Sequence, residues 1–153
     1  MSDTDVRIER LNPLRVAWVR AVGRSPEQDA WDRLTAWARP AGLLDDPVAH
    51  AVFGFNNPSP TSTAAEYGYE LWIAIDKTSQ PPEPIGVKEF PGGLYAVASC
   101  PLTEVPQRWK DLIRWVHSTP HTWQKTAHGL ERVRNPLAPP PEMILDLYLP
   151  LEG

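Results

Sequence analysis

The stretch WDRLTAW at residues 31–37 returns as WKDLIRW at residues 109–115, 78 positions further along the chain. Both stretches have tryptophan at the ends and leucine in the middle, a spacing typical of one helix face. The same offset aligns further pairs without a gap: Val19 with Val97, Ala49-His50 with Ala127-His128, and Asn57-Pro58 with Asn135-Pro136. One offset held over such a length indicates two copies of a single supersecondary unit.

Each copy is predicted to run strand, helix, strand, strand, with a lead strand before it. Runs rich in apolar and β-branched residues give strands at residues 15–22, 49–55 and 67–75 in the first copy, and at 94–100, 129–133 and 143–151 in the second. Helices are predicted to begin after Ser25, where Pro26 and Gln28 complete a capping pattern, and near residues 104–117, capped by Thr103. The lead strands are residues 6–11 and 85–90.

This order predicts an α+β protein with antiparallel sheets and two helices, the two halves being related by an approximate two-fold axis. The repeats are predicted at residues 6–76 and 85–151, and a proline-rich connector at residues 77–84 joins them. A chain of 153 residues suits one domain, so we expect residues 1–153 to form a single domain made of the two repeats.

Composition excludes several classes of protein. With 42% hydrophobic and 22% charged residues the chain has the composition of a soluble globular protein, and its net charge of -4 argues against direct binding of nucleic acid through phosphate contacts. One cysteine excludes an internal disulfide, and the four histidines are dispersed, so we expect no metal site. Gly92-Gly93 is predicted as a turn rather than a phosphate loop, and we expect no cofactor. The N-terminus is acidic and polar and no apolar run approaches about 18 residues, so we expect a cytoplasmic protein without membrane contact.

The predicted strand at residues 67–75 alternates in an unusual way. Leu71 and Ile73 fall on one face, whereas Glu70 and Trp72 fall on the other. Two interpretations stay open. Glu70 is an exposed acid beside a packed tryptophan, or the acid and the aromatic ring share a binding site.

Several motifs together resemble the GyrI-like, or effector-binding, family of small-molecule-binding domains. They are FGFNNP at residues 53–58, YGYELW at 67–72, FPGGLYAV at 90–97 and GLER at 129–132, together with the tryptophan-bearing second helix. The resemblance runs from about Val6 to Leu151. It implies a cleft between two pseudo-symmetric halves that takes bulky hydrophobic or cationic aromatic compounds.

The resemblance also implies a glutamate of the second half in that cleft, and the matching residue is Glu131. The family's usual aromatic residue two positions later is Val133 here, so the aromatic wall must come from elsewhere. The candidate wall residues, with the helical tryptophans that could line its rim, are Phe53, Phe55, Tyr69, Trp72, Trp123, Trp37 and Trp115, and Glu70 is a second candidate acid.

Glu131 also stands out without the resemblance. In the 78-residue alignment it takes the place of Phe53, and Glu70 takes the place of Tyr148. A carboxylate at an apolar strand position must be paired, protonated or available to a cationic ligand. A surface ion pair with Arg132 or Arg134 is the alternative. We interpret His50 and His128, which align with each other, as structural, and Cys100 as a small buried apolar residue.

Three functional hypotheses follow. The favoured one is reversible binding of a hydrophobic or cationic aromatic small molecule, for sequestration of a drug or for sensing, in which aromatic faces attract the cation. The second is a hydrolase that opens strained cyclopropane rings, with Glu131 as general base and Tyr69 assisting. The third is a gyrase-interacting inhibitory protein, so DNA gyrase or a separate DNA-binding regulator is a possible partner.

Overall fold

The computed structural model describes residues 5–153, which divide into two compact units. One unit is Leu14–Phe90, and the other combines residues 5–13 with Pro91–Gly153. Each unit consists of an antiparallel sheet and one α-helix, so the α+β class and the two helices predicted from the sequence are confirmed for the described residues.

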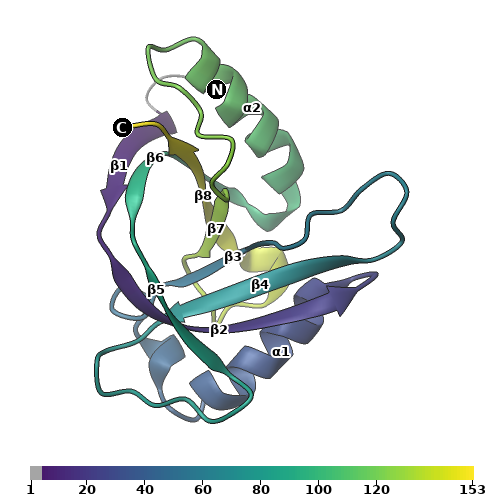
Figure 1. The fold of residues 1–153 in the computed structure, drawn as a ribbon, viewed down its shortest axis with the longest axis vertical. Coiled ribbons are helices and arrows are strands. Elements are labelled where there is room, and N and C mark those ends of the chain that lie inside the picture. The colour runs from purple at the N-terminus through teal and green to yellow at the C-terminus, as the bar shows by residue number, and fades with distance from the viewer. Residues whose placement is uncertain (1–4) are drawn as a thin grey trace. The chain divides into compact units, whose positions relative to one another are not determined.

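The unit Leu14–Phe90 is built from five regular elements. They are β2 (Leu14–Gly23), α1 (Pro26–Ala38), β3 (Val52–Asn56), β4 (Tyr67–Ala74) and β5 (Gly86–Phe90), with a short 3-10 turn at Leu43–Asp45. The strands pair in the order β3-β4-β2-β5, all antiparallel. Helix α1 packs against β2 and β4, the two central strands, and buries Ala30, Leu34 and Ala38 (Figure 1).

The second unit repeats this plan. Its elements are β1 (Val6–Leu11), β6 (Gly93–Pro101), α2 (Val105–His117), β7 (Leu130–Val133) and β8 (Ile144–Leu151), with 3-10 turns at Leu102–Glu104 and Pro140–Glu142. The strand order is β7-β8-β6-β1, again antiparallel. Helix α2 packs against β6 and β8 and buries Leu112 and Val116.

The lead strands are exchanged between the repeats. Strand β1 is the lead strand of the first repeat but pairs with β6 of the second, and β5 is the lead strand of the second repeat but pairs with β2 of the first. The compact units and the sequence repeats therefore differ in which lead strand each contains. Each exchanged strand lies at the edge of its sheet, where it needs one hydrogen-bonded neighbour.

Strand pairing corrects part of the 78-residue alignment. The pair Val97 and Tyr148 in the second unit corresponds to Val19 and Leu71 in the first, so the residue equivalent to Glu70 is Leu147 rather than Tyr148. Glu131 lies opposite Leu147, as Phe55 lies opposite Glu70. Glu131 is thus equivalent to Phe55, and its predicted equivalence with Phe53 is wrong, because the offset shortens in the third and fourth strands.

Two local predictions are also corrected. Strand β3 begins at Val52 rather than at Ala49, because residues 47–50 form a turn in which the Ala49 amide donates to the Asp46 side chain. Thr103 does not cap the second helix, because it lies inside the 3-10 turn and Glu104 is the residue before α2. At α1 the expected Ser25–Gln28 pattern is replaced by a Gln28 to Asp32 hydrogen bond of 2.8 Å. No helix within residues 5–153 is long and apolar enough to cross a membrane.

Candidate functional site

A cluster of aromatic and charged side chains lies on one face of the Leu14–Phe90 sheet. Residues paired across adjacent antiparallel strands share a face, and the register places Trp18 and Phe53 beside Trp72, and Phe55 beside Glu70. Lys88 of β5 lies opposite Val16, two residues before Trp18, and therefore on the same face.

The Glu70 carboxylate is fully partnered inside this cluster. Its side chain accepts hydrogen bonds from Trp72 Nε1 at 2.6 Å and Asn57 Nδ2 at 3.1 Å, and it forms an ion pair with Lys88. Glu70 is only 2% exposed, so the interpretation of Glu70 as an exposed surface acid is wrong. A buried carboxylate requires such partners, because an unpaired charge is costly away from water.

These contacts set the ionisation of Glu70. Burial acts to raise the pKa of this carboxyl, but the hydrogen bonds from Lys88, Trp72 and Asn57, together with the positive charge of Lys88, outweigh it and hold the pKa below its ordinary value of 4.5. Glu70 is therefore a carboxylate at neutral pH.

The Lys88 ammonium group also lies over two aromatic rings of the cluster. Its Nζ lies 4.4 Å from the ring centroid of Trp18 and 5.3 Å from that of Trp72, within the range of cation–π attraction. Trp72 in turn packs against Phe55 and Phe90, with ring centroids 5.0 and 5.2 Å apart. Both faces of β4 are covered, and Trp72 is 7% exposed.

A cavity of about 880 Å³ lies in the same unit. Its walls come from β2, from the C-terminal half of α1 and from the connector, and the lining includes Trp18, Trp37, Arg33, Pro82, Pro84 and Ile85. Trp18 belongs to both features, because it is among the residues that line the cavity and its ring contacts Lys88. The cavity and the acid–aromatic cluster therefore share Trp18.

The cavity lies where β2 extends past the end of its shorter neighbour, β5. Strand β5 pairs with Leu14 to Trp18, whereas β2 continues to Gly23. Arg33 Nη1 reaches the carbonyl oxygen of Arg20 from α1, at 3.4 Å. A Cβ atom at Gly86 would overlap the indole nitrogen of Trp18, so glycine is needed where the ring lies against β5.

The wall that the connector forms is held by hydrogen bonds to backbone carbonyl groups. Arg15 Nη1 donates to the carbonyl oxygens of Asp76 at 2.6 Å and Ser79 at 2.9 Å, and the Ile85 amide donates to the Pro82 carbonyl at 3.0 Å. Prolines restrict the backbone further because their φ angle is fixed. These hydrogen bonds and prolines fix the position of the connector wall.

The candidate residues fall in both units. Six of them belong to the Leu14–Phe90 unit: Phe53, Phe55, Tyr69, Glu70, Trp72 and Trp37. The structure gathers four of these on one face of the sheet, namely Phe53, Phe55, Glu70 and Trp72. Trp37 lines the cavity instead. Tyr69 lies on the opposite face of β4, with its hydroxyl over Gly54. Glu131, Trp115 and Trp123 belong to the other unit.

Glu131 is half-buried and accepts a hydrogen bond from Trp109 Nε1 at 3.1 Å. Trp123 pairs with Leu151 through an isolated bridge, and Lys125 Nζ lies 5.6 Å from its ring centroid. The roles predicted for Glu131 as a ligand-binding or catalytic residue, with Tyr69 assisting, stay predictions.

Trp18 and Lys88 are the site residues that the sequence analysis missed. The alternation of Gly86, Lys88 and Phe90 was the available signal, since it puts a cation and an aromatic ring on one strand face. The signal becomes informative only once β5 is known to pair with β2, which brings Lys88 and Trp18 together.

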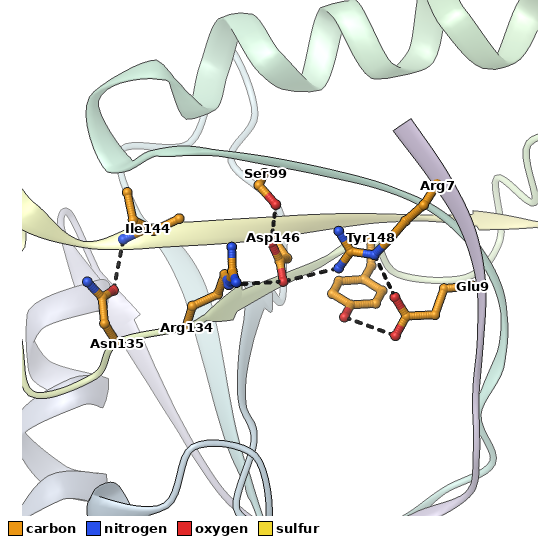
Figure 2. A network of polar contacts seen from close by, with 8 residues as sticks. All are labelled: Arg7, Glu9, Ser99, Arg134, Asn135, Ile144, Asp146 and Tyr148. Carbon is orange, nitrogen blue, oxygen red and sulfur yellow. Dashed lines mark hydrogen bonds and ion pairs between the residues drawn. The ribbon is translucent and has the colours of Figure 1, made fainter. Parts of the chain in front are cut away.

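A second buried acid, Asp146 of β8, has a structural role in the other unit. It accepts a hydrogen bond from Ser99, and Arg7 Nη2 and Arg134 Nε lie 3.3 and 3.8 Å from its Oδ2 (Figure 2). Because Arg7 lies on β1 and Asp146 on β8, their ion pair ties β1 to its sheet, and Arg7 also pairs with Glu9 at 2.9 Å.

Two other polar residues agree with their predicted structural roles. Cys100 is buried, and burial, the largest influence, raises the pKa of its thiol to about 11, so Cys100 is a neutral thiol at neutral pH. His50 Nδ1 lies 2.8 Å from the carbonyl oxygen of Ala74, joining the turn before β3 to the end of β4.

The fold has counterparts among known proteins. The sequence matches the GyrI-like small molecule binding domain over residues 4–152. The chain therefore belongs to this family, and it is a small-molecule-binding domain. A search of curated proteins finds no match.

Solved structures of distant sequence share the fold. The protein SAV2435, bound to tetraphenylphosphonium, is 13% identical, with a TM-score of 0.56 and coverage of 97% of this chain and 94% of that one. A hydrolase from Listeria innocua is 12% identical, with a TM-score of 0.67 and coverage of 97% and 92%. EcmrR in its DNA complex is 13% identical, with a TM-score of 0.73, and this chain spans 57% of its length. At these identities the likeness shows the fold alone.

Proposed function

We propose that the Leu14–Phe90 unit reversibly binds a bulky, hydrophobic aromatic small molecule in the cavity lined by Trp18 and Trp37. The observation that best supports this proposal is the cavity itself. Its volume of about 880 Å³ falls within the roughly 300–1,000 Å³ of small-molecule sites, and its lining includes two tryptophans, prolines and aliphatic residues.

The chemistry of the wall favours flat aromatic ligands. Stacking on an indole ring contributes about 0.5–1.5 kcal/mol beyond the burial of apolar area. SAV2435 is bound to an organic cation, tetraphenylphosphonium, so a cationic aromatic compound is a further candidate ligand. A site that binds without chemical change suits sequestration of a toxic compound or its sensing.

Replacing Trp37 with leucine is expected to weaken the binding of a neutral aromatic probe, acridine, about five- to tenfold, which corresponds to the loss of one stacking contact. The dissociation constant is measured by titration calorimetry at about pH 8, where acridine is uncharged. Trp31→Leu is the matched control, because Trp31 is half-buried on the same helix and is not among the cavity-lining residues of Leu14–Phe90.

The control should bind acridine within about twofold of the parent protein, since it leaves Trp18 and Trp37 in place. Equal losses in Trp31→Leu and Trp37→Leu, or no loss in Trp37→Leu, would contradict the cavity as the binding site. Recovery of unchanged acridine after incubation is expected of a binding protein.

A further inference from the structure

The acid–aromatic cluster already contains a cation that belongs to the chain. A carboxylate and two indole faces are the groups that attract organic cations. In this protein the carboxylate is Glu70, the rings are those of Trp18 and Trp72, and the Lys88 ammonium group contacts all three.

The two partners of the ion pair differ in access to solvent. The Glu70 side chain is 3% exposed, whereas that of Lys88 is 35% exposed. Lysine carries its charge on a flexible four-carbon stem, so the ammonium group can move into water while the carboxylate stays between the strands. The cation in this cluster can therefore be exchanged.

We propose that Lys88 is a tethered cation that competes with cationic ligands for Glu70 and the two indole faces, so that the protein selects neutral aromatic ligands over cationic ones. This inference rests on the proposed function, because Trp18 is shared between the cluster and the cavity. A cationic ligand has to displace Lys88 before it reaches the carboxylate, whereas a neutral ligand stacks in the cavity and leaves the ion pair intact.

The other charges near the cavity act in the same direction. Arg20 and Arg33 line it, and the charge of Arg33 is balanced by Asp29, whose Oδ2 lies 2.8 Å from Arg33 Nη2. Arg20 adds a positive charge to the wall, which disfavours a second cation, and the charge of Glu70 is neutralised by Lys88.

The test compares N-methylacridinium, a permanent cation, with acridine at about pH 8, two probes of nearly equal shape. The parent protein is expected to bind acridine more tightly. Lys88→Met keeps much of the side-chain volume and removes the charge, and it is expected to bind the cation at least about tenfold more tightly than the parent, with acridine affinity changed by less than about threefold.

Two variants control for charge and for the carboxylate. Lys88→Arg keeps a cation in the cluster and should retain the parent's preference. Lys88→Met combined with Glu70→Gln removes the attracting charge and should lose the gain in cation affinity. If Lys88→Met binds acridine like the parent and the cation no better, the competition is refuted while the cavity stands. Failure of the parent and of every variant to bind either probe refutes both proposals.

A second measurement uses the parent protein and does not depend on the folding of Lys88→Met. The ammonium signal of Lys88 is followed by NMR and assigned from its absence in Lys88→Arg. Saturating N-methylacridinium is expected to shift the Lys88 signal towards the position typical of exposed lysines. Acridine is expected to leave the signal where it is in the free protein. An unchanged signal in the cation-saturated protein would overturn the proposal.

Discussion

Replacing Lys88 with methionine is expected to lower the free energy of unfolding by about 2–3 kcal/mol at neutral pH. Removing one partner of a fully buried ion pair costs about 3–5 kcal/mol, and the figure is reduced here because the lysine side chain is partly exposed. The cost arises at Glu70, which stays between the strands with hydrogen bonds from Trp72 and Asn57 but without a counter-ion.

The effect should depend on pH with a definite sign. In the parent, the pKa of Glu70 lies below 4.5, so the stability that its ionised form contributes is complete above about pH 4.5 and is lost as the pH falls through the folded-state pKa. Without Lys88, burial is less opposed and the pKa of Glu70 should rise. The deficit of Lys88→Met should therefore be largest at neutral pH and shrink in acid.

Urea unfolding of four proteins measures this effect: the parent, Lys88→Met, Glu70→Gln and the double variant. We expect the double variant to recover most of the loss, because glutamine keeps the shape of the carboxylate without its charge. A Lys88→Met variant as stable as the parent across the pH range would show that the ion pair contributes nothing to folding.

Replacing Gly68 with alanine is expected to destabilise the protein by about 2–3 kcal/mol, a cost typical of overpacking. A Cβ atom at this position would overlap the backbone carbonyl of Asn57, which cannot rotate away as a side chain could. The two residues are joined by a hydrogen bond from the Asn57 amide to the Gly68 carbonyl, at 2.8 Å. Moving Asn57 would also disturb its side-chain hydrogen bond to Glu70.

Thermal unfolding measures this cost, with an expected fall in Tm of roughly 4–10 °C for a chain of this size. Gly23→Ala is the matched control, because among residues 5–153 a Cβ atom at Gly23 meets nothing within 4 Å. Its stability should stay within about 0.5 kcal/mol of the parent. Equal Tm values for the two variants would contradict the packing at the start of β4.

The regular elements could be predicted from the sequence because each carries a local signal. Alternation located β4, and the repeated tryptophan–leucine spacing located both helices to within a few residues. The exchange of β1 and β5 could not be predicted, because the two lead strands are equivalent in the repeat and either can pair with either sheet. Only the long-range register decides between them.

The site was predictable where it depends on a single strand. Alternation placed Glu70 and Trp72 on one face, but their partners Lys88 and Trp18 come from two other strands, and local pattern says nothing about which strands become neighbours. Glu131 shows the opposite difficulty. Its apparent equivalence with Phe53 came from applying the 78-residue offset along the whole chain. The offset between equivalent residues is shorter in β7 and β8, so Glu131 is equivalent to Phe55.

The most direct test of the cavity as the binding site is an NMR titration that follows the indole N–H signals of the tryptophans during addition of acridine. The signals of Trp18 and Trp37, which line the cavity, are predicted to shift with saturation, and those of Trp31 and Trp109 to stay unchanged. Shifts centred on Trp109, whose indole donates to Glu131, with Trp18 and Trp37 unaffected, would contradict the account and place the ligand in the other unit.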